Sequence, residues 1–184
     1  MSVHDDWVRL LAAPVAVFSA AGAAHAAQYL TVEQAQKAIF GAAAQFERRS
    51  VQLEKPAARE IEKLSGVKLR FTDVPVWQVS ENGKPAGWFF VDEVYGKHEF
   101  ITYAVGLDAE GRVRQIEVLD YRETYGYQVR EAAWRAQFVG KTLADPLKLE
   151  ADIQNIAGAT LSCRHLAEGV KRILAIHDKV LRNS

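Results

Sequence analysis

Cysteine is almost absent from this chain of 184 residues, and charge of a dominant sign is absent as well. The single cysteine, Cys163, excludes an internal disulfide even in an oxidising compartment. The 23 basic residues balance 23 acidic ones and are scattered along the chain. Such a chain has no long-range field toward a phosphate backbone or an anionic lipid surface, so we expect no nucleic-acid partner.

Several motifs and segment types are also missing. No Gly-x-Gly-x-x-Gly segment follows a strand pattern, which argues against direct binding of NADH. No His and Cys pairs stand at metal or haem spacing, so we expect no metal ligand set. Internal repeats, low-complexity stretches and Ser/Gly linkers are absent too, and 49% of the residues are hydrophobic. The composition therefore predicts one globular domain with a sizeable core.

The N-terminal stretch resembles an export signal. Residues 10–24 carry no charge and lead into Ala24-His25-Ala26, a small-x-small pattern that fits cleavage before Ala27. Fifteen uncharged residues are short for a spanning helix, which needs about 20. We therefore predict a signal peptide over residues 1–26 and a periplasmic mature protein, with membrane association of that protein or an uncleaved anchor as alternatives.

The first residues depart from this pattern, because His4, Asp5 and Asp6 make the leading segment acidic where signal peptides begin positive. A translation start near Val8 would leave Arg9 as a short basic leader.

Two short helices are expected early in the mature chain. Thr31 and the Glu33-Gln34 pair form a capping pattern before an apolar stripe that ends at Gly41. Pro56 suits the first turn of a second helix, which runs to about Leu64 and is terminated by Ser65-Gly66.

The middle of the chain has the period of strands. Apolar residues alternate or run on over 67–79, 87–95, 100–107 and 113–119. Asn82-Gly83 is a hairpin signal between the first two segments, and residues 108–111 form a turn between the last two. We predict an α+β fold, an antiparallel sheet meander with helices packed on one face, in a single domain.

Two helices are expected in the last third of the chain, over about 128–138 and about 162–181. In the second, apolar residues recur at spacings of three and four. Thr160 and Ser162 are hydroxyl residues of the kind that cap a first turn. A helix start with free N–H groups favours an anion such as phosphate, although a well-capped helix after a glycine turn explains the same residues without any ligand.

The segment Gly158-Ala159-Thr160, followed by Leu161-Ser162, resembles the Ser/Thr-Gly-Ala-Thr signature of the FMN-binding domains. These occur in the C subunit of the sodium-pumping NADH:quinone reductase and in the G subunit of the Rnf complex. The resemblance implies that Thr160 holds FMN covalently through a phosphoester. Two positions depart from the signature, Ala157 and Gln154, and attachment at Ser162 is the alternative.

A second segment agrees with the same family, in which Glu-Thr-x-Gly follows a strand and helps to wall the flavin site. Here it corresponds to Glu123, Thr124 and Gly126. Tyr125 and Tyr127 are candidates for stacking on the flavin ring. A polar loop with a glycine turn is the alternative interpretation.

The resemblance covers roughly residues 88–181. We therefore divide the chain into the signal peptide, residues 27–84 with the N-terminal helices and first strand, and residues 85–184 as the FMN-binding region.

The resemblance implies an exported electron carrier, flavinylated by a separate flavin transferase that uses FAD and working beside a membrane-bound redox protein. A flavin-free periplasmic binding or assembly module with the same fold is the alternative, motivated by Ala157 and Gln154. A flavin reductase is the weakest hypothesis, since Glu123 and His165 are the candidate acid and base near the motifs and we expect each to be structural. We assign no catalytic residue, and whether the protein is an enzyme stays open.

Two further residues have alternative roles. Lys141 either reaches a phosphate or the flavin edge, or is a solvated lysine at a helix end. Cys163 is either a reactive thiolate or, as we expect, a small buried hydrophobic residue.

Overall fold

The computed structural model describes residues 29–69 and 72–182, and the predicted signal peptide and the translation start near Val8 lie outside these residues. The first half of the chain forms α1 (Val32–Phe40), β1 (Gln45–Gln52), α2 (Lys55–Ser65), β2 (Asp73–Glu81) and β3 (Lys84–Tyr95). The second half forms β4 (Phe100–Asp108), β5 (Val113–Tyr121), the 3-10 turn η1 (Tyr127–Arg130), α3 (Ala132–Arg135), the 3-10 turn η2 (Ala136–Phe138), α4 (Thr160–Ile176) and the π-helical turn η3 (His177–Leu181).

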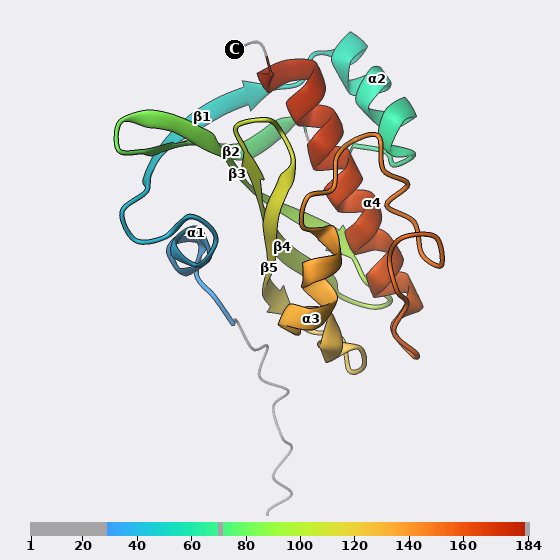
Figure 1. The fold of residues 1–184 in the computed structure, drawn as a ribbon. Helices are drawn as coiled ribbons and strands as arrows, with labels where there is room; N and C mark the ends of the chain where they lie inside the picture. Colours follow the sequence, from blue (N-terminus) through green and yellow to red (C-terminus); the bar gives the residue numbers. More distant parts are fainter. Residues whose placement is uncertain (1–28, 70–71, 183–184) are drawn as a thin grey trace, which may run out of the picture.

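The five strands form one antiparallel sheet in the order β1-β2-β3-β4-β5, so each strand pairs with its neighbour in sequence (Figure 1). The predicted α+β fold with an antiparallel meander is confirmed. The helices were predicted on one face, whereas α1 packs on the face opposite to α2 and α4. Asn82 and Gly83 both have left-handed φ angles, 52° and 74°, as a tight hairpin between β2 and β3 requires. This hairpin joins the predicted N-terminal segment to the FMN-binding region within a single sheet.

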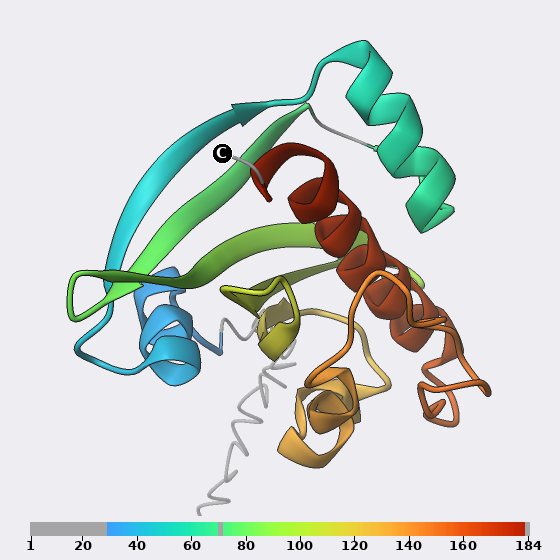
Figure 2. The ribbon, with the colours of Figure 1, turned by 45° about the horizontal axis from the view of Figure 1, so that its top comes forward.

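Each face of the sheet carries its own core. Successive strand residues point to opposite faces, so Phe90 packs in the larger core with α4 while Phe89 packs in a smaller core with α1. Helices α2 and α4 lie side by side on the larger core, and α1 lies apart from them on the other face (Figures 1 and 2). The short helices of residues 127–138 also belong to the larger core, through Trp134 and Phe138.

The caps of the first two helices follow the sequence. Thr31 and Gln34 form a reciprocal capping box at the start of α1, and Gly41 ends that helix. Pro56 lies in the first turn of α2, and Gly66 ends α2 in the left-handed conformation.

The strand prediction is wrong in two places, at the start of the first predicted strand and at β1. Residues 67–69 are not a strand, because the N–H of Leu69 is bound by the Glu62 carboxylate instead of a neighbouring strand. Strand β1 was not predicted, and only two of its residues, Phe46 and Val51, carry large apolar side chains. They pack on opposite faces of this edge strand, Phe46 against the smaller core and Val51 in the larger, so no alternation is visible.

The helix predicted over about 128–138 is broken into η1, α3 and η2. Glu131 is extended, with φ −67° and ψ 135°, between the first two pieces. The carbonyl of Arg130 accepts a 2.9 Å hydrogen bond from the Arg135 guanidinium, which also donates to the carbonyl of Ile116 at 2.7 Å and pairs with Glu117. These bonds to β5 replace continuous helical bonding.

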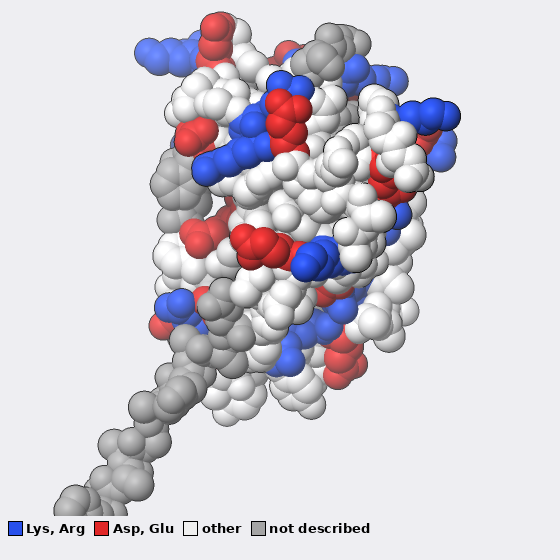
Figure 3. Space-filling view, turned by 90° about the vertical axis from the view of Figure 1, so that its left-hand side faces the viewer, with Lys and Arg blue, Asp and Glu red and all other residues white. Residues whose placement is uncertain are grey.

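On the face of the molecule shown in Figure 3, positive and negative side chains are interspersed. This agrees with a net charge of zero. Among the helices of the described segments, none is long and apolar enough to cross a membrane.

Candidate functional site

Helix α4 begins two residues earlier than predicted, at Thr160, and its cap differs from the prediction. Ala159 is the N-cap residue and has no side-chain acceptor, so the predicted capping by Thr160 and Ser162 is wrong. The Thr160 hydroxyl oxygen instead accepts a 3.1 Å hydrogen bond from the Asn155 amide. Past Ile176 the helix continues as a π-helical turn to Leu181.

The two hydroxyl residues of the motif differ in accessibility. Thr160 is exposed, whereas Ser162 is only 3% exposed. The Ser162 hydroxyl lies 3.4 Å from the phenol oxygen of Tyr121 on β5. Burial raises the pKa of Tyr121, so this phenol stays protonated. Of this pair, the hydroxyl that a large reagent can reach is therefore that of Thr160.

The two motif segments meet at Gly126. This residue has φ +89°, and a Cβ placed on it would overlap the methyl group of Ala159 and crowd the Tyr121 hydroxyl. That hydroxyl also donates to the carbonyl of Tyr125. The Glu123-Thr124-x-Gly126 segment therefore lies directly against the start of α4.

Glu123 holds the turn between β3 and β4. Its carboxylate accepts hydrogen bonds from the backbone N–H groups of Lys97, His98 (2.6 Å) and Glu99 (3.1 Å). Burial opposes ionisation, but these donors outweigh it and lower the pKa of Glu123. Gly96 leaves room for the carboxylate, because a Cβ there would collide with it.

His165, one turn into α4, binds the last residue of β3, which directly precedes the same turn. Its Nδ1 pairs with the carbonyl of Tyr95, and because a carbonyl only accepts, Nδ1 carries the proton. The Tyr95 hydroxyl in turn donates to the carbonyl of His98 at 2.9 Å. Glu123 and His165 are the candidate acid and base. Both side chains are thus hydrogen-bonded to backbone groups at or beside the turn between β3 and β4.

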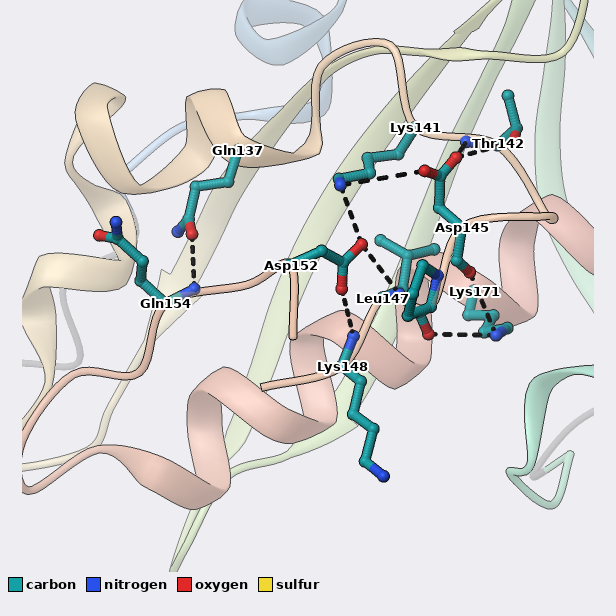
Figure 4. Close-up of polar contacts among 10 residues, drawn as sticks. Gln137, Lys141, Thr142, Asp145, Leu147, Lys148, Asp152, Gln154 and Lys171 are labelled. Atoms are coloured by element: carbon teal, nitrogen blue, oxygen red, sulfur yellow. Dashed lines mark hydrogen bonds and ion pairs between the residues drawn. The ribbon is translucent and has the colours of Figure 1, made fainter. Parts of the chain in front are cut away.

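Lys141 belongs to a network on the segment before α4 (Figure 4). Its ammonium lies 2.8 Å from the Asp152 carboxylate and 4.0 Å from that of Asp145. Asp152 also accepts from the N–H groups of Leu147 (3.2 Å) and Lys148 (2.9 Å). The expectation that Lys141 is either a phosphate ligand or a solvated lysine is wrong, since its charge is already paired.

This network holds a strained segment. Leu147 and Glu150 have left-handed φ angles of 48° and 66°, which side chains with a Cβ rarely adopt. Such strain persists only where the surroundings enforce it, and it is concentrated at functional sites. The bonds from Asp152 to Leu147 and Lys148 provide that enforcement here.

The strained segment forms one wall of a groove, and the exposed side of α4 forms the other. The volume of this groove is about 490 Å³, within the range of roughly 300–1,000 Å³ that small-molecule sites occupy. Thr160 and Arg164 line it from α4, and Lys148, Leu149 and Glu150 line it from the segment. The predicted attachment residue therefore stands in a cavity of cofactor size.

Exposed apolar side chains gather near the two motif segments. Tyr125 and Tyr127 are 75% and 60% exposed, and Leu161 is also exposed. Thr124 is exposed, and Gly158 has φ +81° with open space where a Cβ would point. These residues are available to a bound molecule.

Cys163 is fully buried in the larger core. Burial raises the pKa of its thiol, which rules out the reactive thiolate and confirms a small buried hydrophobic residue.

Three parts of this region were not found from the sequence: Gly96 with the turn over residues 97–99, Asn155, and the groove wall over residues 146–150. Gly96 follows a strand pattern and Asn155 lies in a polar loop, but neither position indicates its partner. Pro146 favours a bend in the chain, and nothing in its sequence context indicates a cavity.

Together, these features define a class of protein, an antiparallel α+β domain with an exposed threonine at the start of a long helix and a groove beside it. Residues 96–175 match the family model of the FMN-binding domain, and the predicted resemblance to this family is confirmed. Among curated proteins, none matches the chain.

The residues present fit an FMN group attached through a threonine. The candidate nucleophile is exposed, lines the groove and has its oxygen held by an amide donor. The groove carries Lys148, Arg164 and Lys171 against Glu150 and Glu168, an excess of one positive charge that suits a phosphate diester.

Proposed function

We propose that this protein is an exported flavoprotein that carries FMN covalently on Thr160 and transfers electrons between a membrane redox protein and another acceptor. The observation that carries the proposal is the position of Thr160, exposed and lining a groove of cofactor size within the matched family segment. The flavin supplies the redox chemistry when bound, and the protein sets its orientation and access.

In the attachment step, the Thr160 oxygen forms a bond to the FMN phosphorus of FAD. The phosphorus–oxygen bond to the AMP half would break, AMP would leave, and the hydroxyl proton would be released to solvent. The Asn155 amide donates to the Thr160 oxygen and fixes its position, which leaves the hydroxyl proton free to depart. A separate flavin transferase performs the reaction.

The residues around Thr160 leave space for the flavin, pack the motif or support the start of α4. Gly158 leaves open space beside the motif, Ala159 packs against Gly126, and Leu161 stays exposed. Glu123 contributes by holding the turn over residues 97–99, and the exposed Thr124, Tyr125 and Tyr127 flank the site. Ser162 supports the helix start from inside the core.

An electron carrier suits this site better than a stand-alone catalyst. Glu123 and His165 are both bound to backbone groups, so neither is poised to exchange a proton with a substrate. A covalent tether also retains the flavin outside the cytoplasm. Export itself rests on the expected signal peptide over residues 1–26.

The test is the intact mass of the exported protein after coexpression with a flavin transferase. We expect a gain of one FMN less one water, and Thr160→Val should abolish it. An unmodified wild-type mass under these conditions contradicts the proposal.

A flavin-free binding or assembly module is the second candidate, because Ala157 and Gln154 depart from the family signature. Gln154 is fixed through its backbone, with its N–H bonded to Gln137 at 2.6 Å and its carbonyl to Trp134 at 2.9 Å. This places it as part of the scaffold. A colourless preparation from a flavinylating host favours the module, and a yellow one favours the carrier.

A further inference from the structure

The groove beside Thr160 contains an arginine on the same side of α4. Arg164 is four residues after Thr160, so the two side chains are neighbours one helical turn apart. Both line the groove, and both are exposed. Within residues 29–69 and 72–182, the Arg164 guanidinium has no hydrogen-bond acceptor and no ion-pair partner.

The lysines of this region are placed differently. Lys171 also lines the groove, but its ammonium donates to the carbonyls of Asp145 (3.2 Å) and Pro146 (3.1 Å). Lys141 is paired with Asp152. Lys148 lies on the opposite wall of the groove and not on α4, and its backbone N–H donates to the Asp152 carboxylate. Among the residues that the structure describes, Arg164 is therefore the uncommitted cation on the helix face that carries Thr160.

A guanidinium group in this position is suited to bind a phosphate group. It presents paired N–H donors that match two oxygens of a phosphate group, and such charge-assisted hydrogen bonds are stronger than neutral ones. Glu168 lies one further turn along α4 and is not within ion-pair distance of Arg164. An ester on Thr160 would place its anionic phosphate one turn from this arginine.

We propose that Arg164 is the positioning residue for the phosphate diester on Thr160, where it neutralises the diester charge and orders the attached flavin in the groove. The inference rests on the proposed function. It assigns Arg164 no part in electron transfer, and it predicts effects on the attachment step and on the mobility of the attached group.

The first measurement is the initial rate of flavinylation with purified transferase and FAD, followed by intact mass. Arg164→Ala should lower the rate about three- to tenfold and Arg164→Glu further, as expected for loss of a partly solvated charge-assisted contact. Arg164→Lys should recover most of the rate. Lys37→Glu is the matched control, because Lys37 is an exposed residue of α1, which packs on the opposite face of the sheet from α4. This charge change should leave the rate unchanged.

The second measurement uses the fully flavinylated proteins after removal of the transferase. Fluorescence anisotropy of the attached flavin should be lower in Arg164→Ala than in wild type, and Arg164→Lys should lie near wild type. High salt should lower the wild-type value toward that of Arg164→Ala, because salt screens an exposed charge pair. Thermal unfolding of the unmodified variants should be unchanged, since the Arg164 side chain is exposed and makes no hydrogen bond or ion pair with the described residues.

The outcomes distinguish a failure of the role proposed for Arg164 from a failure of the proposed function. If wild type gains no FMN, the proposed function itself fails. If wild type is modified and Arg164→Ala matches it in rate and anisotropy, the function stands and the inference is overturned. A slower rate with unchanged product anisotropy also overturns it, because Arg164 would then be recognised by the transferase. A slower rate together with a more mobile flavin supports it.

Discussion

The backbone of Gly126 lies directly against the methyl group of Ala159, 33 positions later in the sequence. This contact joins the Glu-Thr-x-Gly segment after β5 to the Gly-Ala-Thr segment at the start of α4. The two segments that the sequence singled out separately thus form one region of the structure.

Replacement of Gly126 by alanine should destabilise the protein and misplace the start of α4. The new Cβ would overlap Ala159, and φ +89° is unfavourable for alanine, so we expect a loss of about 2 to 4 kcal/mol in the free energy of unfolding. Gly140→Ala is the matched control, since Gly140 has φ +78° and open space around it and should cost only about 1 kcal/mol. Urea unfolding measures both, and equal losses would show that the contact with Ala159 does not matter.

Substitution of Ser162 by alanine should leave the FMN mass gain intact. The Ser162 hydroxyl is buried and makes one long 3.4 Å contact with Tyr121, so its loss should cost no more than about 1 kcal/mol of stability. Thr160→Ser should keep the modification, because it retains the exposed oxygen. A mass gain that survives Thr160→Val and disappears in Ser162→Ala would reverse the assignment between the two residues.

Glu123 should stabilise the turn over residues 97–99 in a pH-dependent way. Its pKa is lowered in the folded state, so its stabilising effect is complete above the ordinary value of 4.5 and is lost as the pH falls through the folded pKa. Glu123→Gln keeps an acceptor oxygen but not the charge, and should therefore lose less stability than wild type between pH 6 and pH 3. Asp145 and Asp152 also have lowered pKa values, so the slope should shrink without vanishing.

Urea unfolding at several pH values gives the stability curves for Glu123→Gln, and amide exchange at residues 97–99 gives the local effect. Faster exchange confined to this turn is expected. Identical acid limbs in the variant and the wild type would contradict the role given to Glu123.

His177, at the far end of α4, should make the fold sensitive to mild acid. Burial lowers its pKa, so the folded state holds it neutral while the unfolded chain takes up a proton near the ordinary value of 6.5. Stability is therefore unaffected above that pH and declines as the pH falls from about 6.5 to the folded pKa, by about 1.4 kcal/mol per unit of depression. His177→Gln should flatten the stability profile in this range, and an unchanged slope would exclude His177 as its cause.

Much of the architecture was predictable because its signals are local. The Thr31 and Gln34 box, the Gly66 stop and the Asn82-Gly83 hairpin depend on the conformations that neighbouring residues adopt. Strand β1 was not predictable in this way, since Phe46 and Val51 enter cores on opposite faces of the sheet. The prediction of a continuous helix over 128–138 is wrong for a similar reason, because Arg135 bonds to Ile116 and Glu117 of β5, which are distant in sequence.

The sequence by itself determined the caps of α1 and α2, the order of strands β2 to β5, and the two short motifs that resemble the FMN-binding domain. Only the tertiary structure decided that Thr160 is exposed and Ser162 buried, that Lys141 is paired with Asp152, and that Arg164 lines a groove with no partner among the described residues. Caps and turns depend on residues a few positions apart, and their energies can be read from the chain. Exposure and charge pairing depend on what packs alongside, and here those neighbours come from segments distant in sequence.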